Sequence, residues 1–325
     1  MFTCKPLAAA ILTVLATHAF ADFDTSRQEQ TGDYNHAEVT QKNGLYNTGR
    51  NVAEQYQAGN RGTVEIYQET DSFAKAVQTQ TATSSSSTLS ARQFATAGHS
   101  RSEQSQSNGA GNSGTVSQQH ATNVEAIQSQ DGSNNNGMID QYGETGGIAR
   151  SYQQGSWNDS SIQQTLGANN EAELQQTGEY NKGSISQQNA NGAIAQVEQN
   201  GTGNNLTAKQ TGVANELFFN QNGSNNDASL SQRGNDNLIT GLSSGDYHHA
   251  EVIQDGSSLN AELSQFGGHD NAIDISQNGA DQYAQVTQVG GAYNLATVVQ
   301  NDMQANQAFI QQSGTGNTAL VSQAR

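Results

Sequence analysis

The sequence predicts an all-β fold, a β-solenoid of stacked two-strand coils that form two parallel sheets. Three observations predict it: units of 11–12 residues that end in glutamine, two-residue alternation within each unit, and glycine just after it. Only 33% of the 325 residues are hydrophobic, against 41 Gln, 34 Asn and 34 Gly, so a thick apolar core is excluded. This composition suits either disorder or an extended stack of strands, and the repeat favours the stack.

The repeat is most regular between residues 141 and 323, where seventeen units follow one another in steps of 11 or 12 residues. Sixteen units end in Gln, and the exception is Ser243. An apolar residue stands two positions earlier in fifteen units, the exceptions being Ser151 and Gly241, and Asn stands six positions earlier in twelve. Stacked coils in register would place like amides over one another and let each bond the next. The predicted Gln ladder is Gln141, Gln153, Gln164, Gln176, Gln187, Gln199, Gln210, Gln221, Gln232, Gln254, Gln265, Gln277, Gln288, Gln300, Gln312 and Gln323. The predicted Asn ladder is Asn158, Asn170, Asn181, Asn204, Asn215, Asn226, Asn237, Asn271, Asn294, Asn306 and Asn317.

Each unit reads as one strand and one turn. Asn, Ala, an aliphatic residue and Gln alternate with polar residues, which indicates a strand with one inward and one outward face. Two residues after the terminal Gln there is usually a residue that accepts a left-handed backbone, as tight turns require. The predicted turn glycines are Gly143, Gly155, Gly178, Gly212, Gly223, Gly234, Gly256, Gly279, Gly290 and Gly314. The single proline, Pro6, precedes all units, consistent with strands that need every backbone donor.

Three segments are expected along the chain. Residues 1–21 read as a secretory signal peptide, with a basic Lys5, an apolar run and a small-x-small cleavage site at Ala19–Ala21. Residues 22–134 hold partly degenerate repeats, whose stretch 69–110 is loop-like, either loosened rungs or a loop that leaves the stack. Residues 135–325 form the regular solenoid. With the N-terminal units, up to 26 strands are expected. The proposed N-terminal unit ends are Gln30, Gln41, Gln57, Gln68, Gln78, Gln93, Gln106, Gln118 and Gln128.

The sequence offers little chemistry. A net charge of −17 with only 13 Lys and Arg argues against a nucleic-acid partner. The one apolar run is too short to span a membrane. His248 and His249 are adjacent, so on a strand they would point to opposite faces rather than share a metal. We therefore expect that the protein is not an enzyme and that it has no catalytic residue, no cofactor and no metal site. Aromatic residues in or near the turns either pack on neighbouring coils or bind a surface: Tyr142, Trp157, Phe266 and Tyr293.

The units resemble the curlin repeat of the curli family, the bacterial functional amyloids. That repeat runs Ser/Asn-x5-Gln-x-Gly-x-x-Asn-x-Ala-x3-Gln, and the segments 30–41 and 221–232 follow it from the first Gln onward. The resemblance implies export through an outer-membrane secretion pore and assembly into a β-solenoid amyloid fibre in the biofilm matrix. It also implies a related curli subunit as partner, either the nucleator (minor subunit) or the major subunit. It implies an extracellular, fimbrium-like location on a bacterium. A Gly-rich targeting segment like that of the family's major subunit does not follow Ala21.

The leading interpretation is a secreted structural subunit that forms a homopolymer fibre and supports adhesion. The last unit, 317–323, is a near-regular rung, so we expect an uncapped edge that can template an incoming chain. Three alternatives stay open: the nucleator instead of the main fibre subunit, a soluble secreted β-solenoid adhesin or other binding module, and a disordered matrix polymer.

Overall fold

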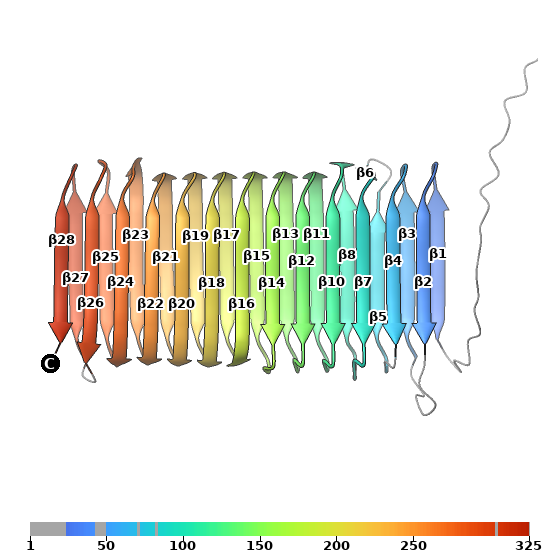
Figure 1. Ribbon diagram of the computed structural model, residues 1–325, viewed down its shortest axis with the longest axis horizontal. Coiled ribbons are helices and arrows are strands. Elements are labelled where there is room, and N and C mark those ends of the chain that lie inside the picture. Colours follow the sequence, from blue (N-terminus) through green and yellow to red (C-terminus); the bar gives the residue numbers. More distant parts are fainter. Residues whose placement is uncertain (1–23, 43–49, 70–71, 82–83, 303–304, 325) are drawn as a thin grey trace, which may run out of the picture.

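The computed structural model describes residues 24–42, 50–69, 72–81, 84–302 and 305–324. The proposed signal peptide lies outside them. Strands stack side by side along the long axis, and the two ends of the described chain lie at opposite ends of the stack (Figure 1). Two parallel sheets of thirteen strands each run the length of the molecule, so the predicted β-solenoid is confirmed.

Apart from two strands of two residues each, successive strands alternate between the sheets, so that each coil places one strand in each. In spatial order, sheet A holds β1 (Thr25–Thr31), β3 (Val52–Ala58), β5 (Lys75–Gln80), β8 (Arg101–Ser107), β11 (Glu125–Ser133), β13 (Ile148–Ser156), β15 (Glu171–Glu179), β17 (Ile194–Thr202), β19 (Glu216–Ser224), β21 (Leu238–Asp246), β23 (Asn260–His269), β25 (Tyr283–Val289) and β27 (Gln307–Ser313). Sheet B holds β2 (His36–Lys42), β4 (Thr63–Glu69), β7 (Thr88–Phe94), β10 (Ser113–Gln119), β12 (Asn136–Tyr142), β14 (Asp159–Thr165), β16 (Lys182–Asn191), β18 (Asn205–Val213), β20 (Asp227–Asn235), β22 (His249–Ser257), β24 (Ala272–Ala280), β26 (Leu295–Asp302) and β28 (Thr318–Ala324).

Most of the described residues between 69 and 110 belong to the stack rather than to a loop outside it. Strands β5, β7 and β8 lie within this stretch and pair in register with their neighbours in the two sheets. The additional residues form a small separate sheet of β6 (Ser84–Ser85) and β9 (Gly109–Ala110). The irregular sequence is therefore accommodated at the turns, because a rung needs only its few inward residues to pair.

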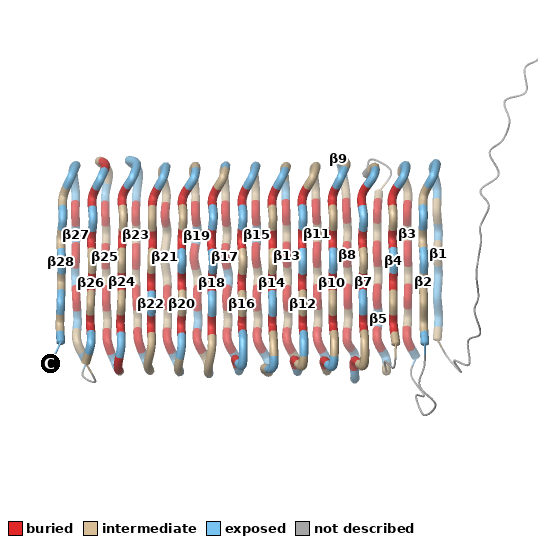
Figure 2. Tube along the Cα trace, viewed as in Figure 1, coloured by how far each residue is buried: buried red, intermediate tan, exposed pale blue. Residues whose placement is uncertain are grey.

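Buried residues alternate with partly or fully exposed ones along most strands, as the two-residue period predicts (Figure 2). Between the sheets, one continuous apolar cluster extends from Val116 to Ile310. A second, small cluster of Ala53, Ile66, Ala76 and Ala91 lies in the N-terminal coils. The core is thin and linear, so each coil is stabilised mainly by the coils on either side.

The separation of the two clusters has a structural cause in sheet A. There the inner position that carries Leu174 or Val286 in later coils is occupied by glutamine in five early coils. These side chains form their own ladder, Gln28–Gln55–Gln78–Gln104–Gln128, with amide distances of 2.8–3.1 Å.

This inner ladder corrects two of the unit ends expected from sequence. The register pairs Gln57 with Gln80 and Gln106 with Gln130, so the units end at Gln80 and Gln130 rather than at Gln78 and Gln128. Both glutamines of each Gln-x-Gln motif point inward because their spacing is two. The local sequence therefore cannot distinguish the two positions.

Candidate functional site: amide ladders and open end strands

The glutamines of sheet B form one unbroken ladder. Twelve hydrogen bonds of 2.7–3.0 Å connect thirteen side chains, and each Nε2 donates to the Oε1 of the next coil toward the C-terminus. The members are Gln41, Gln68, Gln93, Gln118, Gln141, Gln164, Gln187, Gln210, Gln232, Gln254, Gln277, Gln300 and Gln323. Because every donor points the same way, the ladder has a direction along the stack.

Sheet A carries a second ladder with the same direction and one gap. Bonds of 2.8–3.0 Å connect Gln30, Gln57, Gln80, Gln106, Gln130, Gln153, Gln176, Gln199 and Gln221. After Ser243 the ladder resumes as Gln265, Gln288 and Gln312, at 3.2 and 2.8 Å. The predicted single list of glutamines thus lies in two ladders, one for each sheet.

Most ladder glutamines also connect the two sheets, as Gln187 shows. The Nε2 of Gln187 donates to the backbone oxygens of Glu171 and Ala193 at 2.9 and 3.1 Å, in addition to Oε1 of Gln210. Its side chain is completely buried. A buried amide is stabilising only when its polar atoms are paired, and here the repeat supplies the partners.

The asparagines bond differently from the glutamines. In sheet B the Oδ1 of Asn158 accepts the backbone N–H of Asn181, and the Nδ2 of Asn158 donates to the backbone oxygen of Gly178. The residues of this series are Asn112, Asn135, Asn158, Asn181, Asn204, Asn226, Asn271, Asn294 and Asn317, and His248 takes the place of an asparagine between Asn226 and Asn271. Each of these residues before Asn317 therefore contacts the next coil, and the asparagines join its start and its turn.

The predicted asparagines of sheet A are Asn170, Asn215, Asn237 and Asn306, and they do not form a continuous series. Asn215 accepts the backbone N–H of Asn237 at 3.2 Å, and Asn170 accepts that of Ala193 at 3.0 Å. The intervening coils carry Ala193, Leu259 or Gln282 at this position.

All ten predicted turn glycines have positive φ, between 62° and 155°. Gly178 shows why a side chain is excluded there. An added Cβ would lie 2.0 Å from the backbone oxygen of Gly201 in the next coil, the atom that accepts from Asn181. The close approach of the coils and the backbone conformation both require glycine.

The gap at Ser243 leaves unpaired groups. The Ser243 Oγ and the Oε1 of Gln265 are buried without a partner, because the serine side chain is too short to reach the next coil.

The Ser243→Gln variant is expected to complete the sheet A ladder. Two new amide bonds, to Gln221 and Gln265, should raise the free energy of unfolding by about 1 kcal/mol. Guanidinium unfolding followed by circular dichroism measures this change. Ser244→Gln, one residue along and on the outer face, is the matched control and should have no effect. A lower stability of Ser243→Gln would contradict the expectation.

Glu144 is a second defect. Its side chain is completely buried, Oε1 accepts from Nδ2 of Asn170 at 3.0 Å, and Oε2 is buried without a partner. Burial raises the pKa of Glu144 above its usual 4.5, while the hydrogen bonds from Asn170 partly offset this.

A raised pKa in the folded state means that the folded chain binds the proton more tightly than the unfolded chain. The protonated form therefore stabilises the fold at low pH, and this contribution is lost as pH rises above 4.5 through the folded-state pKa. We expect Glu144→Gln to be more stable than the parent at pH 8, by about 1–3 kcal/mol, with the difference shrinking toward pH 4. Unfolding midpoints at the two pH values measure it, and exposed Glu179→Gln is the control. A constant difference would refute the assignment.

Three of the four predicted turn aromatics pack on neighbouring coils, and the fourth, Phe266, is exposed on β23. Trp157 stacks on Tyr180 with ring centroids 6.2 Å apart, and Tyr142 and Tyr293 contact His120 and His269 at 5.5 and 5.3 Å. His248 is buried within the Asn series of sheet B, whereas His249 lies on the outer face.

The geometry defines a class of protein, a parallel β-solenoid built from amide-bonded repeats. Within it, residues 201–234 match the family model of the curlin associated repeat, so the resemblance is confirmed for this segment. The match runs from the turn glycine Gly201 through β18, β19 and most of β20 to the turn glycine Gly234. No curated protein matches the sequence. Among the described residues, no helix has the length and apolarity to cross a bilayer. The repeat and the solenoid are structural rather than catalytic features.

Proposed function

We propose that the protein is a secreted structural subunit that assembles head to tail into curli-like functional amyloid fibres on the bacterial surface. The observation that carries the proposal is the match between the two end surfaces of the described stack. One end presents β27 and β28, and the other presents β1 and β2, so that a second copy can continue both sheets.

The side chains at the two ends agree with this continuation. Extending the register of sheet B places Val321 against Val39 and Gln323 against Gln41 of the next copy. Gln312 and Gln323 stand at the donor ends of the ladders, and Gln30 and Gln41 stand at the acceptor ends. Both ladders would therefore continue across the junction with their direction unchanged.

The asparagine pattern supports the same junction. Asn317 is the last member in sheet B, and at the other end the Oδ1 of Asn35 accepts the backbone N–H of Gly62 at 3.1 Å. In the continued register, Asn317 would accept the backbone N–H of Asn35 from the next copy. One position is not matched, since Ile310 would lie against Gln28.

The curlin repeat adds three further parts to this proposal. They are export through an outer-membrane pore, a related curli subunit as nucleation partner, and a role in biofilm adhesion. The length of the stack favours a fibre-building subunit over a nucleator. Self-assembly is the part that the end surfaces support.

The test is to dilute the full chain from denaturant and follow thioflavin fluorescence, electron microscopy and fibre diffraction. We expect a lag, seeding by preformed fibres and a meridional reflection near 4.7–4.8 Å. A lasting β-rich monomer would overturn the proposal and favour a soluble adhesin. A lasting random-coil spectrum would favour a disordered matrix polymer.

A further inference from the structure

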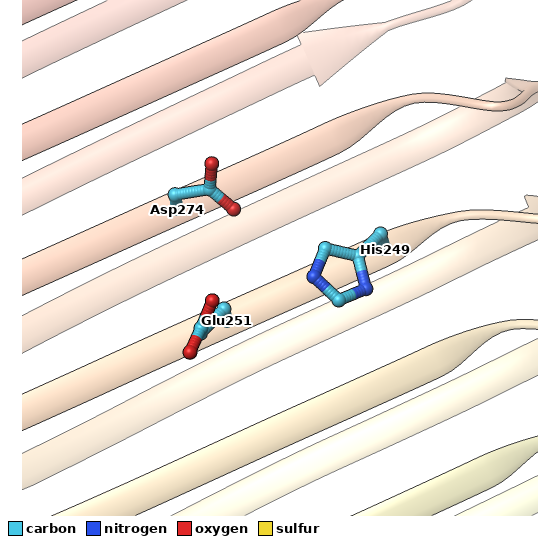
Figure 3. Close-up of side chains that lie close together, drawn as sticks. All are labelled: His249, Glu251 and Asp274. Atoms are coloured by element: carbon cyan, nitrogen blue, oxygen red, sulfur yellow. The ribbon is translucent and has the colours of Figure 1, made fainter.

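A cluster of possible metal ligands lies on the outer face of sheet B, away from the end surfaces. His249, Glu251 and Asp274 each offer a ligand atom, and these atoms all lie within 4.8 Å of one another (Figure 3). His249 and Glu251 are two residues apart on β22, so both point outward, and Asp274 is the register partner of Glu251 on β24.

We propose that this cluster binds one Zn²⁺ ion per chain, or a similar divalent transition metal. An imidazole nitrogen with two carboxylates is a ligand set that zinc accepts in proteins, usually with water at the remaining position. Zinc–ligand distances of about 2.1 Å put neighbouring donor atoms about 3.4 Å apart. The side chains are partly exposed on the surface, so small rotations can close the remaining separation.

A fourth residue orients the histidine. The Nδ1 of His249 lies 3.3 Å from Oδ2 of Asp227 on the adjacent strand β20. In Figure 3 the other ring nitrogen is turned toward Glu251 and Asp274. A carboxylate that holds one nitrogen of a metal-binding histidine is a common feature of zinc sites, since it sets the tautomer and the ring orientation.

The charges around the cluster favour a cation. Glu251 lies directly opposite Asp274, and their other register neighbours are the uncharged Ser229 and Thr297. Opposed like charges destabilise a sheet. Elsewhere on the described surface, arginine neutralises acidic groups, as where Arg150 contacts Glu171 at 2.7 Å. A bound divalent ion would neutralise Glu251 and Asp274 in the same way.

The chain contains a matched comparison in its first coils. His36 and Glu38 occupy the same positions on β2, and Glu65 is the register partner of Glu38 on β4. Here β2 is the first strand of sheet B, so the described stack holds no strand that could supply a counterpart of Asp227. The first coils therefore carry the same three residue types without the orienting carboxylate, and they serve as a control for the site at His249.

The test is calorimetric titration of the folded full chain with ZnCl₂, with circular dichroism to verify folding of every variant. We expect about one equivalent of Zn²⁺, an affinity at least tenfold lower in His249→Ala, and about tenfold lower in Asp227→Asn. The control His36→Ala should bind as the parent does. Excess Ca²⁺, which prefers oxygen ligands, should not displace the zinc.

Three results would overturn the site. Unchanged binding in His249→Ala, or no heat of binding at all, would show that this cluster holds no zinc. Displacement by Ca²⁺ would show that carboxylates alone attract the ion. Because the cluster lies away from the end surfaces, the result is independent of whether the chain forms fibres.

Discussion

A Leu320→Pro chain is expected to fold as the parent does but to elongate fibres at least tenfold more slowly. Leu295 donates its backbone N–H to the oxygen of Asn317 at 2.8 Å, so the odd-numbered residues of β28 face β26. The even-numbered residues, including Leu320, then direct their N–H and C=O groups to the open edge. Proline at 320 removes one edge donor while leaving the internal bonds in place, and edge strands tolerate it.

Every junction between copies contains one C-terminal edge, so growth at either fibre end should be slowed. Seeded thioflavin kinetics with parent fibres measure the rate. The matched control is Leu320→Ala, which shortens the same exposed side chain but keeps the N–H group. If Leu320→Pro elongates at the parent rate, β28 does not form the junction. If Leu320→Ala is slowed equally, the side chain and not the edge hydrogen bond is responsible.

The second large effect is expected from Gln187→Leu. The substitution removes bonds to Gln164, Gln210 and two backbone oxygens, and it leaves Oε1 of Gln210 buried without its partner. We expect the free energy of unfolding to fall by about 2–4 kcal/mol, although leucine is more apolar and similar in size. The hydrophobic effect alone predicts the opposite sign.

Guanidinium unfolding at a concentration that keeps the chain monomeric measures the difference. The control is Gln188→Leu, which makes the same chemical change at the exposed neighbouring position and should lie within about 0.5 kcal/mol of the parent. Equal stability of the two variants would mean that the amide ladder contributes nothing beyond side-chain volume.

The spacing of Gln, Asn and Gly in the sequence is enough to predict most of the fold. Unit ends such as Gln141 and Gln164 were predictable because the two-residue period decides which residues face inward. Turn residues such as Gly178 were predictable because the chain reverses there and only a left-handed conformation fits. These are local properties, and they repeat often enough to remove ambiguity.

Only the tertiary structure decided which of two inward glutamines ends a unit, as at Gln78 and Gln80, because both satisfy the same period. It also decided how the asparagines bond, since Asn158 reaches a turn in the next coil, at Gly178. The sequence did not indicate the cluster that we propose as a zinc site, for a related reason. The sequence neighbour of His249 is His248, which lies on the opposite face, whereas its partners Asp227 and Asp274 lie 22 and 25 residues away. Sequence determines the face on which a side chain lies, and stacking determines which side chains from other coils it meets there.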